Sequence, residues 1–259
     1  MEPITDLVVI PVYNERATVR QVIEATLGLT RAHVLVVDDG STDGSAEEVA
    51  ALTGPRVQLL RHATNLGYGR SLRDGFQVAL ERGACYLVTL DADTQHEPAW
   101  IPRFLQKIRA AGVDVLSGSR YLDPLMAGQG TIPPERLAIN REVTGWINAR
   151  TGLNLTDAFC GFKAYRVAAL RGLDLTEDGY AFPLEFWAEA WRNGLIVREE
   201  PVPPVYSVTF ERRFPGPLDD PEVRRAYYRE VWERSLAKAE RLGRRFRVEG
   251  EAGREATCP

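Results

Sequence analysis

Short apolar runs alternate with segments of helical spacing through the first half of the chain, and this alternation is the feature that most restricts its fold. We expect strands at residues 7–13, 34–37, 57–60, 86–90 and 113–117. Their richness in valine, isoleucine and leucine is typical of strands that are buried on both faces. Strands that alternate with helices form a mostly parallel sheet with helices on both faces. The sequence therefore predicts an α/β fold.

The second half of the chain is less regular. We expect one helix near residues 137–151 and a long one over about 221–247. A loop rich in glycine and proline spans 123–134, and a loop of this length is often a lid or a binding element. A proline-rich, extended stretch at 201–217 comes before the last helix.

Composition excludes several classes of protein. The formal net charge of −4 gives no reason to expect nucleic acid as a partner. No stretch approaches the roughly 20 apolar residues that span a bilayer, and the N-terminus lacks the pattern of a signal peptide. Cys85, Cys160 and Cys258 are sparse and have no metal-type spacing, which is typical of a reducing compartment. We therefore expect a cytoplasmic protein that meets a membrane only from its surface. His33 and His62 flank strands, and we interpret both as structural.

Polar clusters follow the expected strands at the points where they end. The four clusters are Tyr13-Asn14-Glu15, Asp38-Asp39-Gly40-Ser41, Asn65-Leu66-Gly67 and Asp91-Ala92-Asp93. Each cluster alone is ordinary turn chemistry. In a parallel sheet, however, the carboxyl ends of the strands share one edge, and ligands bind there. The convergence of the clusters predicts a binding site that includes Gly67.

The Asp-x-Asp pair formed by Asp91 and Asp93 predicts a site for a divalent metal ion. In an extended segment residues i and i+2 project to the same side, so both carboxylates can reach one ion. Mg²⁺ and Mn²⁺ take oxygen ligands and commonly share them with substrate phosphates. Gln95 and His96 are further candidate ligands, and the alternative for His96 is an ordinary loop residue.

Charged residues outside this pair are candidates for substrate contact. One carboxylate of the pair Asp38 and Asp39 can accept hydrogen bonds from a base or from ribose hydroxyls, with turn chemistry as the alternative. Arg120 and Arg141 offer fixed positive charge for a phosphate, with surface salt bridges as the alternative. Asp157 is a candidate general base or acceptor-positioning group, with capping as the alternative. Glu185 is a candidate acid in an aromatic segment.

The chain ends in a long basic helix. We expect a main domain over residues 1–215, followed by the C-terminal helix and tail over 216–259. One stripe of this helix is apolar, and its other positions carry many arginines. Either the helix packs on the domain with a solvated basic face, or it lies on an anionic membrane surface as an amphipathic element. The sequence leaves both arrangements open.

Three motifs taken together resemble a known family. They are Val9-Ile10-Pro11-Val12-Tyr13-Asn14-Glu15, Val37-Asp38-Asp39-Gly40-Ser41-Thr42-Asp43-Gly44 and Asp91-Ala92-Asp93-Thr94-Gln95-His96. Over roughly residues 5–215 the chain resembles an inverting glycosyltransferase of family 2 with the GT-A fold. Further segments resemble the dolichyl-phosphate or polyprenyl-phosphate mannose synthase branch of that family. These segments are Gln95-His96-Glu97-Pro98, Gly118-Ser119-Arg120-Tyr121, Asn140-Arg141 and Asp157-Ala158-Phe159-Cys160-Gly161-Phe162.

The resemblance implies a donor site for a nucleotide diphosphate sugar, either a GDP-hexose or a UDP-hexose. The residues that would hold the base and ribose are Pro11, Tyr13, Glu15 and Asp39. Asp91 would also contact the nucleotide. Asp93 and Gln95 would help to bind Mg²⁺ or Mn²⁺ on the donor pyrophosphate.

On the acceptor side, the resemblance implies that Arg120 and Arg141 face the phosphate of the acceptor. A phosphate is already anionic and needs no base, whereas a hydroxyl acceptor needs one, for which Asp157 is the first candidate. This chain departs from the branch at Cys160, where Ser or Thr is usual. It also has Arg-Arg-Phe-Pro-Gly at 212–216 in place of a Gly-x-Ser-Lys segment that is associated with acceptor contacts.

We therefore expect a metal-dependent, inverting glycosyltransferase that moves a hexose onto a polyprenyl phosphate. One alternative keeps the donor chemistry but uses a soluble hydroxyl compound or a glycan as acceptor. An alternative of another class is a non-catalytic subunit that binds a nucleotide sugar, and the intact Asp-x-Asp pair argues against it. The sequence names neither the sugar nor the base, and it leaves the oligomeric state open.

Overall fold

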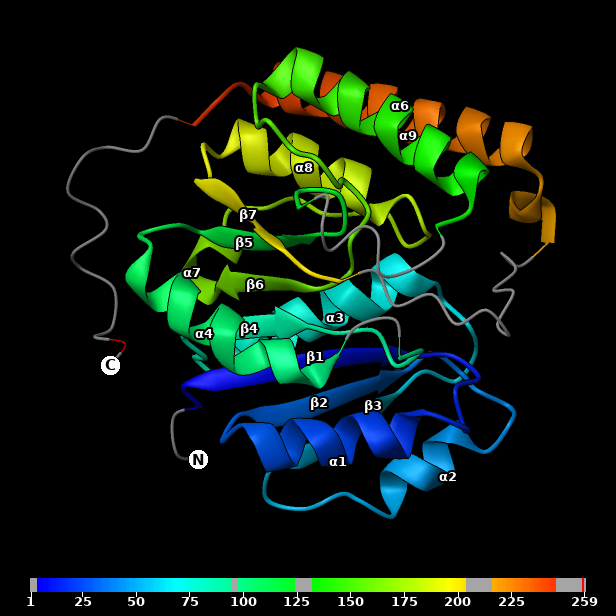
Figure 1. Cartoon of the computed structure of the whole chain (residues 1–259), viewed down its shortest axis with the longest axis vertical. Helices are drawn as coiled ribbons and strands as arrows, with labels where there is room; N and C mark the ends of the chain where they lie inside the picture. Colours follow the sequence, from blue (N-terminus) through cyan, green and yellow to red (C-terminus); the bar gives the residue numbers. More distant parts are fainter. Residues whose placement is uncertain (1–3, 95–96, 124–131, 204–215, 246–257, 259) are drawn as a thin grey trace.

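The computed structural model describes residues 4–94, 97–123, 132–203, 216–245 and 258. Its centre is a seven-stranded sheet in the order β3-β2-β1-β4-β6-β5-β7 (Figure 1). The strands are β1 (Asp6–Val12), β2 (His33–Asp38), β3 (Val57–Arg61), β4 (Tyr86–Thr89), β5 (Val115–Ser119), β6 (Lys163–Arg166) and β7 (Val197–Pro201). All five strands expected from the sequence are present, and β6 and β7 are additional.

The sheet is parallel except at β6. β1 pairs in parallel with β2 and β4, and β2 pairs in parallel with β3. β6 runs antiparallel to both β4 and β5, whereas β7 is parallel to β5. The expected α/β fold with a mostly parallel sheet is confirmed. The carboxyl ends of β1, β2 and β4 consequently lie at one edge.

Helices cover both faces of the sheet, and β1 shows how the sequence directs this. Leu7 and Val9 belong to one buried cluster, with residues of α3, α6, α8 and α9. Val8 and Ile10 point the other way, into a cluster with residues of α1, α2 and α4. Successive strand residues point to opposite faces, so a continuous apolar run supplies both cores.

The two helices that we expected at 137–151 and about 221–247 are both present, as α6 and α9. The helices are α1 (Val19–Leu29), α2 (Ser45–Ala50), α3 (Tyr68–Glu81), α4 (Ile101–Ala110), α6 (Pro134–Thr151), α7 (Val167–Leu170), α8 (Phe182–Arg192) and α9 (Pro221–Leu242), with short 3₁₀ turns η1 (Pro98–Trp100) and η2 (Gly216–Asp219). Asp220 caps α9 by accepting hydrogen bonds from the backbone N–H groups of Glu222 and Val223.

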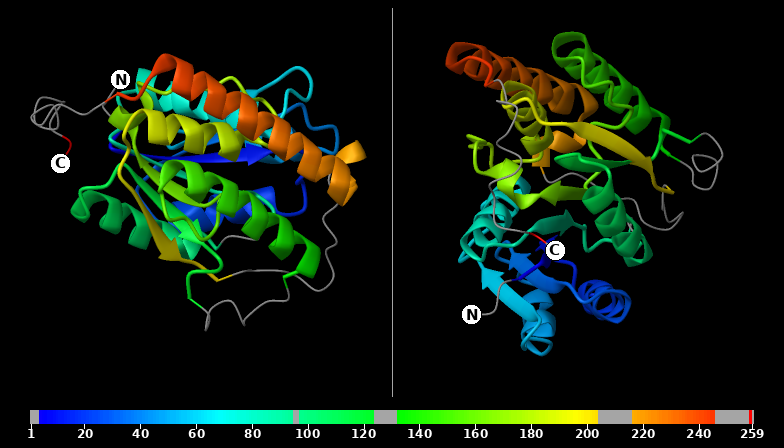
Figure 2. Two further views of the ribbon diagram at one scale, coloured as in Figure 1. Left: turned by 90° about the horizontal axis from the view of Figure 1, so that it is seen from above. Right: turned by 90° about the vertical axis from the view of Figure 1, so that its left-hand side faces the viewer.

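The C-terminal helix α9 packs on the rest of the protein. It lies against α8 and α6 at the top of Figure 1, and Figure 2 shows the same neighbours from two further sides. Tyr228, Val231, Trp232 and Ala239 are buried in the same cluster as the sheet residues. The helix that we expected after residue 215 therefore shares one core with the domain that we expected over residues 1–215. Of the two arrangements left open by the sequence, the structure has the packed one.

Much of the basic face of α9 is engaged in ion pairs with acids of the other helices and loops. Arg225 Nε lies 2.8 Å from Glu142 Oε2 on α6, and Arg224 pairs with Glu135 at the start of the same helix. Toward the other end, Arg234 Nη2 lies 2.6 Å from Glu177 Oε2. These ion pairs fix the position of α9 against α6 and against the segment that contains Glu177. They also reduce the positive charge that α9 could offer to an anionic membrane.

Two further expectations concern the environment of the chain. Cys85, just before β4, forms a disulfide with Cys258, with 5.7 Å between the Cα atoms, and Cys160 is a buried free thiol. A disulfide is the opposite of what a reducing compartment predicts. Within the ranges that the structure describes, no helix is both long enough and apolar enough to cross a bilayer.

Several sequence expectations fall outside the described residues. These are the candidate ligands Gln95 and His96, most of the 123–134 loop and most of the proline-rich stretch at 201–217, including 212–215.

Candidate functional site

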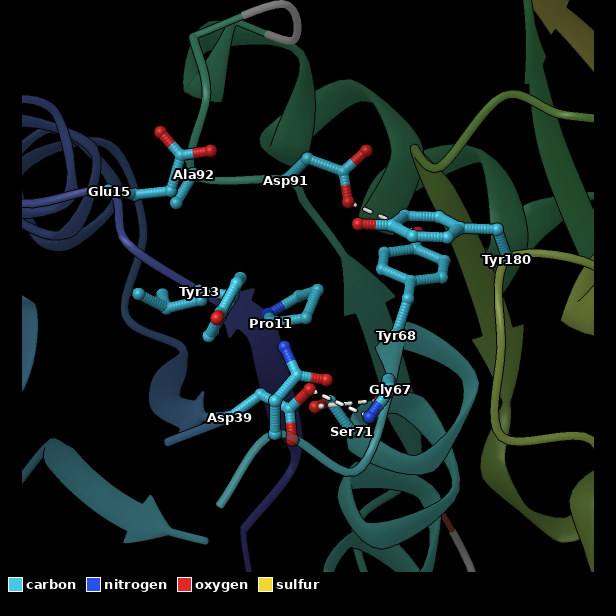
Figure 3. Close-up of a pocket in the computed structure, with 12 residues that line it drawn as sticks. Pro11, Tyr13, Glu15, Asp39, Gly67, Tyr68, Ser71, Asp91, Ala92 and Tyr180 are labelled. Atoms are coloured by element: carbon cyan, nitrogen blue, oxygen red, sulfur yellow. Dashed lines mark hydrogen bonds between the residues drawn. The ribbon is translucent and has the colours of Figure 1, made fainter. Parts of the chain in front are cut away.

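A pocket opens at the carboxyl edge of the sheet, beside the ends of β1, β2 and β4. It encloses about 530 Å³, part of which is open solvent (Figure 3). Its lining residues are Pro11, Val12, Tyr13, Glu15, Asp39, Asn65, Gly67, Tyr68, Ser71, Asp91, Ala92 and Tyr180. The structure thus brings together all six residues that we expected to bind substrate, namely Pro11, Tyr13, Glu15, Asp39, Gly67 and Asp91. Their role in binding stays a prediction.

Hydrogen bonds link the loop after β1 to the loop after β2. Ser41 Oγ accepts from the backbone N–H of Asn14 at 2.9 Å, and Ser45 Oγ accepts from that of Glu15 at 2.8 Å. Asn14 has a positive φ of 57°, and its side-chain oxygen accepts from the backbone N–H of Thr42. Because these two loops are hydrogen-bonded to each other, the polar residues that follow β1 and β2 form one rim of the pocket.

The two aspartates that end β2 have different surroundings. Asp38 is fully buried and faces Arg61, with 3.3 Å between its Oδ2 and the arginine Nε. Asp39 turns to the pocket, where its two carboxylate oxygens accept from the backbone N–H groups of Leu66 and Gly67 at 2.8 Å each. Asp39 is therefore the member of the pair that can contact a ligand, and it also fixes the loop after β3.

The wall opposite β1 comes from a segment that carries no recognisable motif. Tyr180, just before α8, stacks on Tyr68 with 6.0 Å between ring centroids and 9° between ring planes. Gly67 has a φ of 111°, and a Cβ there would lie 2.2 Å from the carbonyl oxygen of Asp178. Glycine at this position lets the segment approach closely. Sequence reasoning missed Tyr180 because only tertiary packing brings it to the pocket. It also missed Tyr68, although Tyr68 directly follows Gly67 in the sequence.

The Asp-x-Asp pair lies at the upper end of this pocket. Asp91 Oδ1 accepts a hydrogen bond from the Tyr68 hydroxyl at 3.1 Å, and Asp93 is 8% exposed just outside the lining residues. A Cβ on Gly161 would lie 2.3 Å from Asp91 Oδ2, so β4 and the segment before β6 meet here with no room for a side chain.

These carboxylates suit a hard cation that is shared with a ligand. Among the residues that the structure describes, no group of three or more His, Cys, Asp and Glu side chains could hold a metal ion. Two carboxylates completed by phosphate oxygens is the donor set that Mg²⁺ and Mn²⁺ commonly use with nucleotides. Asp91 and Asp93 fit such an ion, and Gln95 lies outside the described residues.

Arg120 and Asp157 form a buried ion pair. The Nε of Arg120 lies 2.7 Å from Asp157 Oδ2, and its Nη2 lies 2.9 Å from Oδ1. Asn140 Nδ2 donates to the same Oδ1 at 2.7 Å. Burial alone would raise the pKa of Asp157, but the charge of Arg120 and the hydrogen bonds from Arg120 and Asn140 lower the pKa to about 2.

This environment does not suit the general base that we considered for Asp157. Its side chain is fully buried, and both oxygens already accept hydrogen bonds. A base works best when its pKa lies near the operating pH, and a pKa of about 2 is far below it. The other interpretation, a group that positions its neighbours, agrees with the geometry because Asp157 orients the guanidinium of Arg120.

The remaining two candidates lie outside the pocket lining. Arg141 is exposed on α6, one residue after Asn140. Glu185 on α8 is buried and accepts hydrogen bonds from the backbone N–H groups of Thr176 and Glu177 at 2.7 Å. Glu185 therefore fixes the segment that leads to Tyr180 through these hydrogen bonds, and it is not one of the residues that line the pocket.

The mostly parallel sheet, with a carboxylate-lined pocket at its carboxyl edge, defines an α/β protein with the GT-A fold of glycosyltransferases. The model of glycosyl transferase family 2 matches residues 7–173, and the chain belongs to this family.

Two curated relatives cover most of the chain. The polyprenol monophosphomannose synthase of Mycolicibacterium smegmatis is 34% identical over 206 residues, which are 76% of this chain and 76% of the relative. The undecaprenyl-phosphate mannosyltransferase of Micrococcus luteus is 35% identical over 206 residues, which are 76% of this chain and 82% of the relative. The chain is therefore a glycosyltransferase.

Solved structures show the same fold at low sequence identity. Mannosyl-3-phosphoglycerate synthase from Rubrobacter xylanophilus superposes with a TM-score of 0.68 at 16% identity, covering 95% of this chain and 78% of the other. Glucosyl-3-phosphoglycerate synthase from Mycobacterium tuberculosis, in complex with Mn²⁺, UDP-glucose and phosphoglyceric acid, gives 0.64 at 19% identity, covering 91% and 79%. Both comparisons support the GT-A fold.

Proposed function

We propose that this chain is a metal-dependent, inverting glycosyltransferase that moves a hexose from a nucleotide diphosphate sugar to a polyprenyl phosphate. The observation that carries the choice of acceptor is the buried pair of Arg120 and Asp157. The names of the two curated relatives, which both specify mannose and a polyprenyl-type acceptor, support the same choice. Mannose is accordingly the first sugar to test.

The donor half of the proposal rests on the pocket. Asp39, which is held by the backbone N–H groups of the loop after β3, offers a carboxylate acceptor for a base or ribose, and Tyr13 in the same pocket is 41% exposed. Asp91 and Asp93 lie at the end of the pocket where a pyrophosphate would follow the ribose. A divalent ion bound there would offset the negative charge that develops on the leaving nucleoside diphosphate.

The acceptor half of the proposal rests on the environment of Asp157, which does not suit a general base. A hydroxyl acceptor needs a base, and the carboxylate first expected to serve has both oxygens bound and a pKa lowered to about 2. A phosphate acceptor is already an anion, and it needs a fixed cation to orient it. Arg120, held bidentately by Asp157 and 14% exposed at its side chain, offers such a cation.

The two halves are joined by a short segment. Asp157 begins the stretch that reaches Gly161, and Gly161 packs directly against the carboxylate of Asp91. In this proposal an acceptor oxygen held by Arg120 attacks the sugar carbon on the face opposite to the leaving group, and such an attack inverts the anomeric configuration.

The test is transfer of labelled sugar to a defined acceptor. Purified protein is incubated with Mg²⁺ or Mn²⁺, GDP-mannose or UDP-glucose, and either a polyprenyl phosphate or the matching polyprenol. We expect a glycosyl phosphate from the phosphate acceptor alone, and loss of product with Asp93→Ala or Arg120→Gln. Transfer to the polyprenol, or to a soluble glycan in the absence of any polyprenyl phosphate, would contradict the proposed acceptor and favour a hydroxyl acceptor.

A polyprenyl phosphate resides in a bilayer, so the proposal includes peripheral contact with a membrane surface. The basic face of α9 gives this contact little support, because Arg224, Arg225 and Arg234 are paired with acids of the same protein. We therefore propose that contact is made near the acceptor side of the site, where Arg141 is exposed on α6.

A further inference from the structure

His62 lies between two carboxylates behind the wall of the donor pocket. It follows β3 and is 8% exposed. Its Nδ1 lies 2.7 Å from Asp39 Oδ1, and its Nε2 lies 2.9 Å from Asp74 Oδ2 on α3. An ionised carboxylate only accepts hydrogen bonds, so both ring nitrogens must donate for both contacts to hold. The geometry therefore selects the doubly protonated imidazolium form.

One of these carboxylates belongs to the pocket. Asp39 lines it, and it also accepts from the backbone N–H groups of Leu66 and Gly67. Oδ1 is shared by His62 and Leu66, and Oδ2 accepts from Gly67. Three donors from three directions fix the carboxylate in one orientation. His62 is the side-chain donor among these three, and as an imidazolium it also brings a positive charge.

The charges around His62 balance in the protonated form. Asp39, at the end of β2, and Asp74, on α3, face the ring directly. Arg70 lies behind Asp74, with its Nε 2.8 Å from Asp74 Oδ2. Two carboxylates and two cations make a neutral cluster. A neutral side chain in place of the imidazolium would leave the cluster with one excess negative charge beside the pocket.

We propose that His62 is a positioning residue for donor binding, acting through Asp39. This proposal rests on the proposed function, because it assumes that the pocket takes a nucleotide sugar. As an imidazolium, His62 holds Asp39 toward the base and ribose and cancels the extra negative charge beside an anionic donor. A neutral side chain at this position does neither, so donor affinity falls when the charge of His62 is removed.

The effect falls on binding more than on the chemical step. Asp39 lies at the nucleoside end of the pocket, away from Asp91 and Asp93, where the pyrophosphate and the reacting carbon would lie (Figure 3). Loss of the imidazolium therefore raises the donor KM and leaves kcat at saturating donor nearly unchanged. A residue that only stabilised the fold would not produce this separation.

The experiment measures donor binding by titration calorimetry, and donor KM and kcat, at neutral pH. The ligand is GDP-mannose or UDP-glucose with Mg²⁺. The variants are His62→Gln, which has no charge, and His62→Arg, which keeps a charge and can donate to both carboxylates. His33→Gln is the matched control, since His33 begins β2, at the end of the strand opposite to Asp38.

We expect His62→Gln to bind the donor about tenfold more weakly than the wild-type protein, as the loss of one charged hydrogen bond implies. His33→Gln and His62→Arg should bind with affinities close to that of the wild-type protein. Melting temperatures measured without donor verify that each variant is folded. If His62→Gln binds the donor as tightly as His33→Gln, the role of His62 is refuted while the donor site stands. If the folded wild-type protein binds no nucleotide sugar, the proposed function is refuted, and this inference is refuted with it.

Discussion

Replacing Asp157 with asparagine tests whether this carboxylate acts as the anchor of Arg120. The substitution keeps the shape of the side chain but removes the negative charge of a fully buried carboxylate that binds the Arg120 guanidinium. The fall of the Asp157 pKa from 3.8 to about 2 corresponds to roughly 2.5 kcal/mol of native-state stabilisation at neutral pH. Breaking a buried pair by removing one partner costs about 3–5 kcal/mol. We therefore expect Asp157→Asn to unfold at a free energy lower by about 2–4 kcal/mol.

The direction of the pH dependence follows from the lowered pKa. Asp157 has a lower pKa in the folded protein than in the unfolded chain, so its contribution is complete above about pH 4 and is lost as the pH falls toward about 2. The stability difference between wild type and Asp157→Asn should thus shrink on acidification. Urea unfolding at a series of pH values measures it directly.

The control is a second Asp–Arg pair that is exposed. Asp178 pairs with Arg73 and its side chain is 48% exposed, so Asp178→Asn should cost less than about 1 kcal/mol. For a chain of this size, about 2–4 kcal/mol lowers the melting temperature by roughly 5–15 °C. If Asp157→Asn melts together with Asp178→Asn, or if the difference from wild type grows at low pH, the assignment of Asp157 as the anchor of Arg120 is wrong.

Further predictions concern the pocket wall and the C-terminal helix. Gly161→Ala should abolish metal-dependent donor binding in a calorimetric titration while the protein stays folded, because the new Cβ would lie 2.3 Å from Asp91 Oδ2; unchanged binding would contradict the packing. Tyr180→Ala should raise the donor KM by about tenfold, since a stacked aromatic pair and its buried area are lost, whereas Tyr180→Phe, which keeps the ring, should resemble wild type. Glu177→Gln should lower the free energy of unfolding by about 1–3 kcal/mol in urea, because Glu177 is 8% exposed and receives hydrogen bonds from Tyr227 as well as Arg234; an unchanged midpoint would show that this contact contributes nothing.

The strand ends explain why most of the pocket could be predicted from the sequence. Apolar runs give the strands, a parallel sheet sends their carboxyl ends to one edge, and the polar clusters that follow must then meet. The six residues expected to bind substrate are brought together in this way. Nothing beyond strand order and alternation is needed to place Asp39 and Asp91 on the same side.

Other features depend on contacts that no local pattern records. β6 has the sequence Lys-Ala-Tyr-Arg and runs antiparallel between β4 and β5, and a segment of four residues without apolar alternation predicts neither a strand nor its direction. His62 has partners on β2 and α3, so its sequence neighbours gave no reason to see more than a structural residue. The basic face of α9 looked solvated because the acids that pair with it come from α6 and from the segment before α8.

The segment before α8 has a consequence for how such enzymes can be divided. The family match ends at residue 173, yet Tyr180 forms a wall of the pocket. Glu177, three residues earlier, is bound by Tyr227 and Arg234 of α9. The pocket is thus completed by residues beyond the matched region, and α9 holds those residues in place. A fragment cut at the family boundary would lack one side of its own binding site. In a chimera between relatives, the chain from this segment through the end of α9 would have to be exchanged as a single piece.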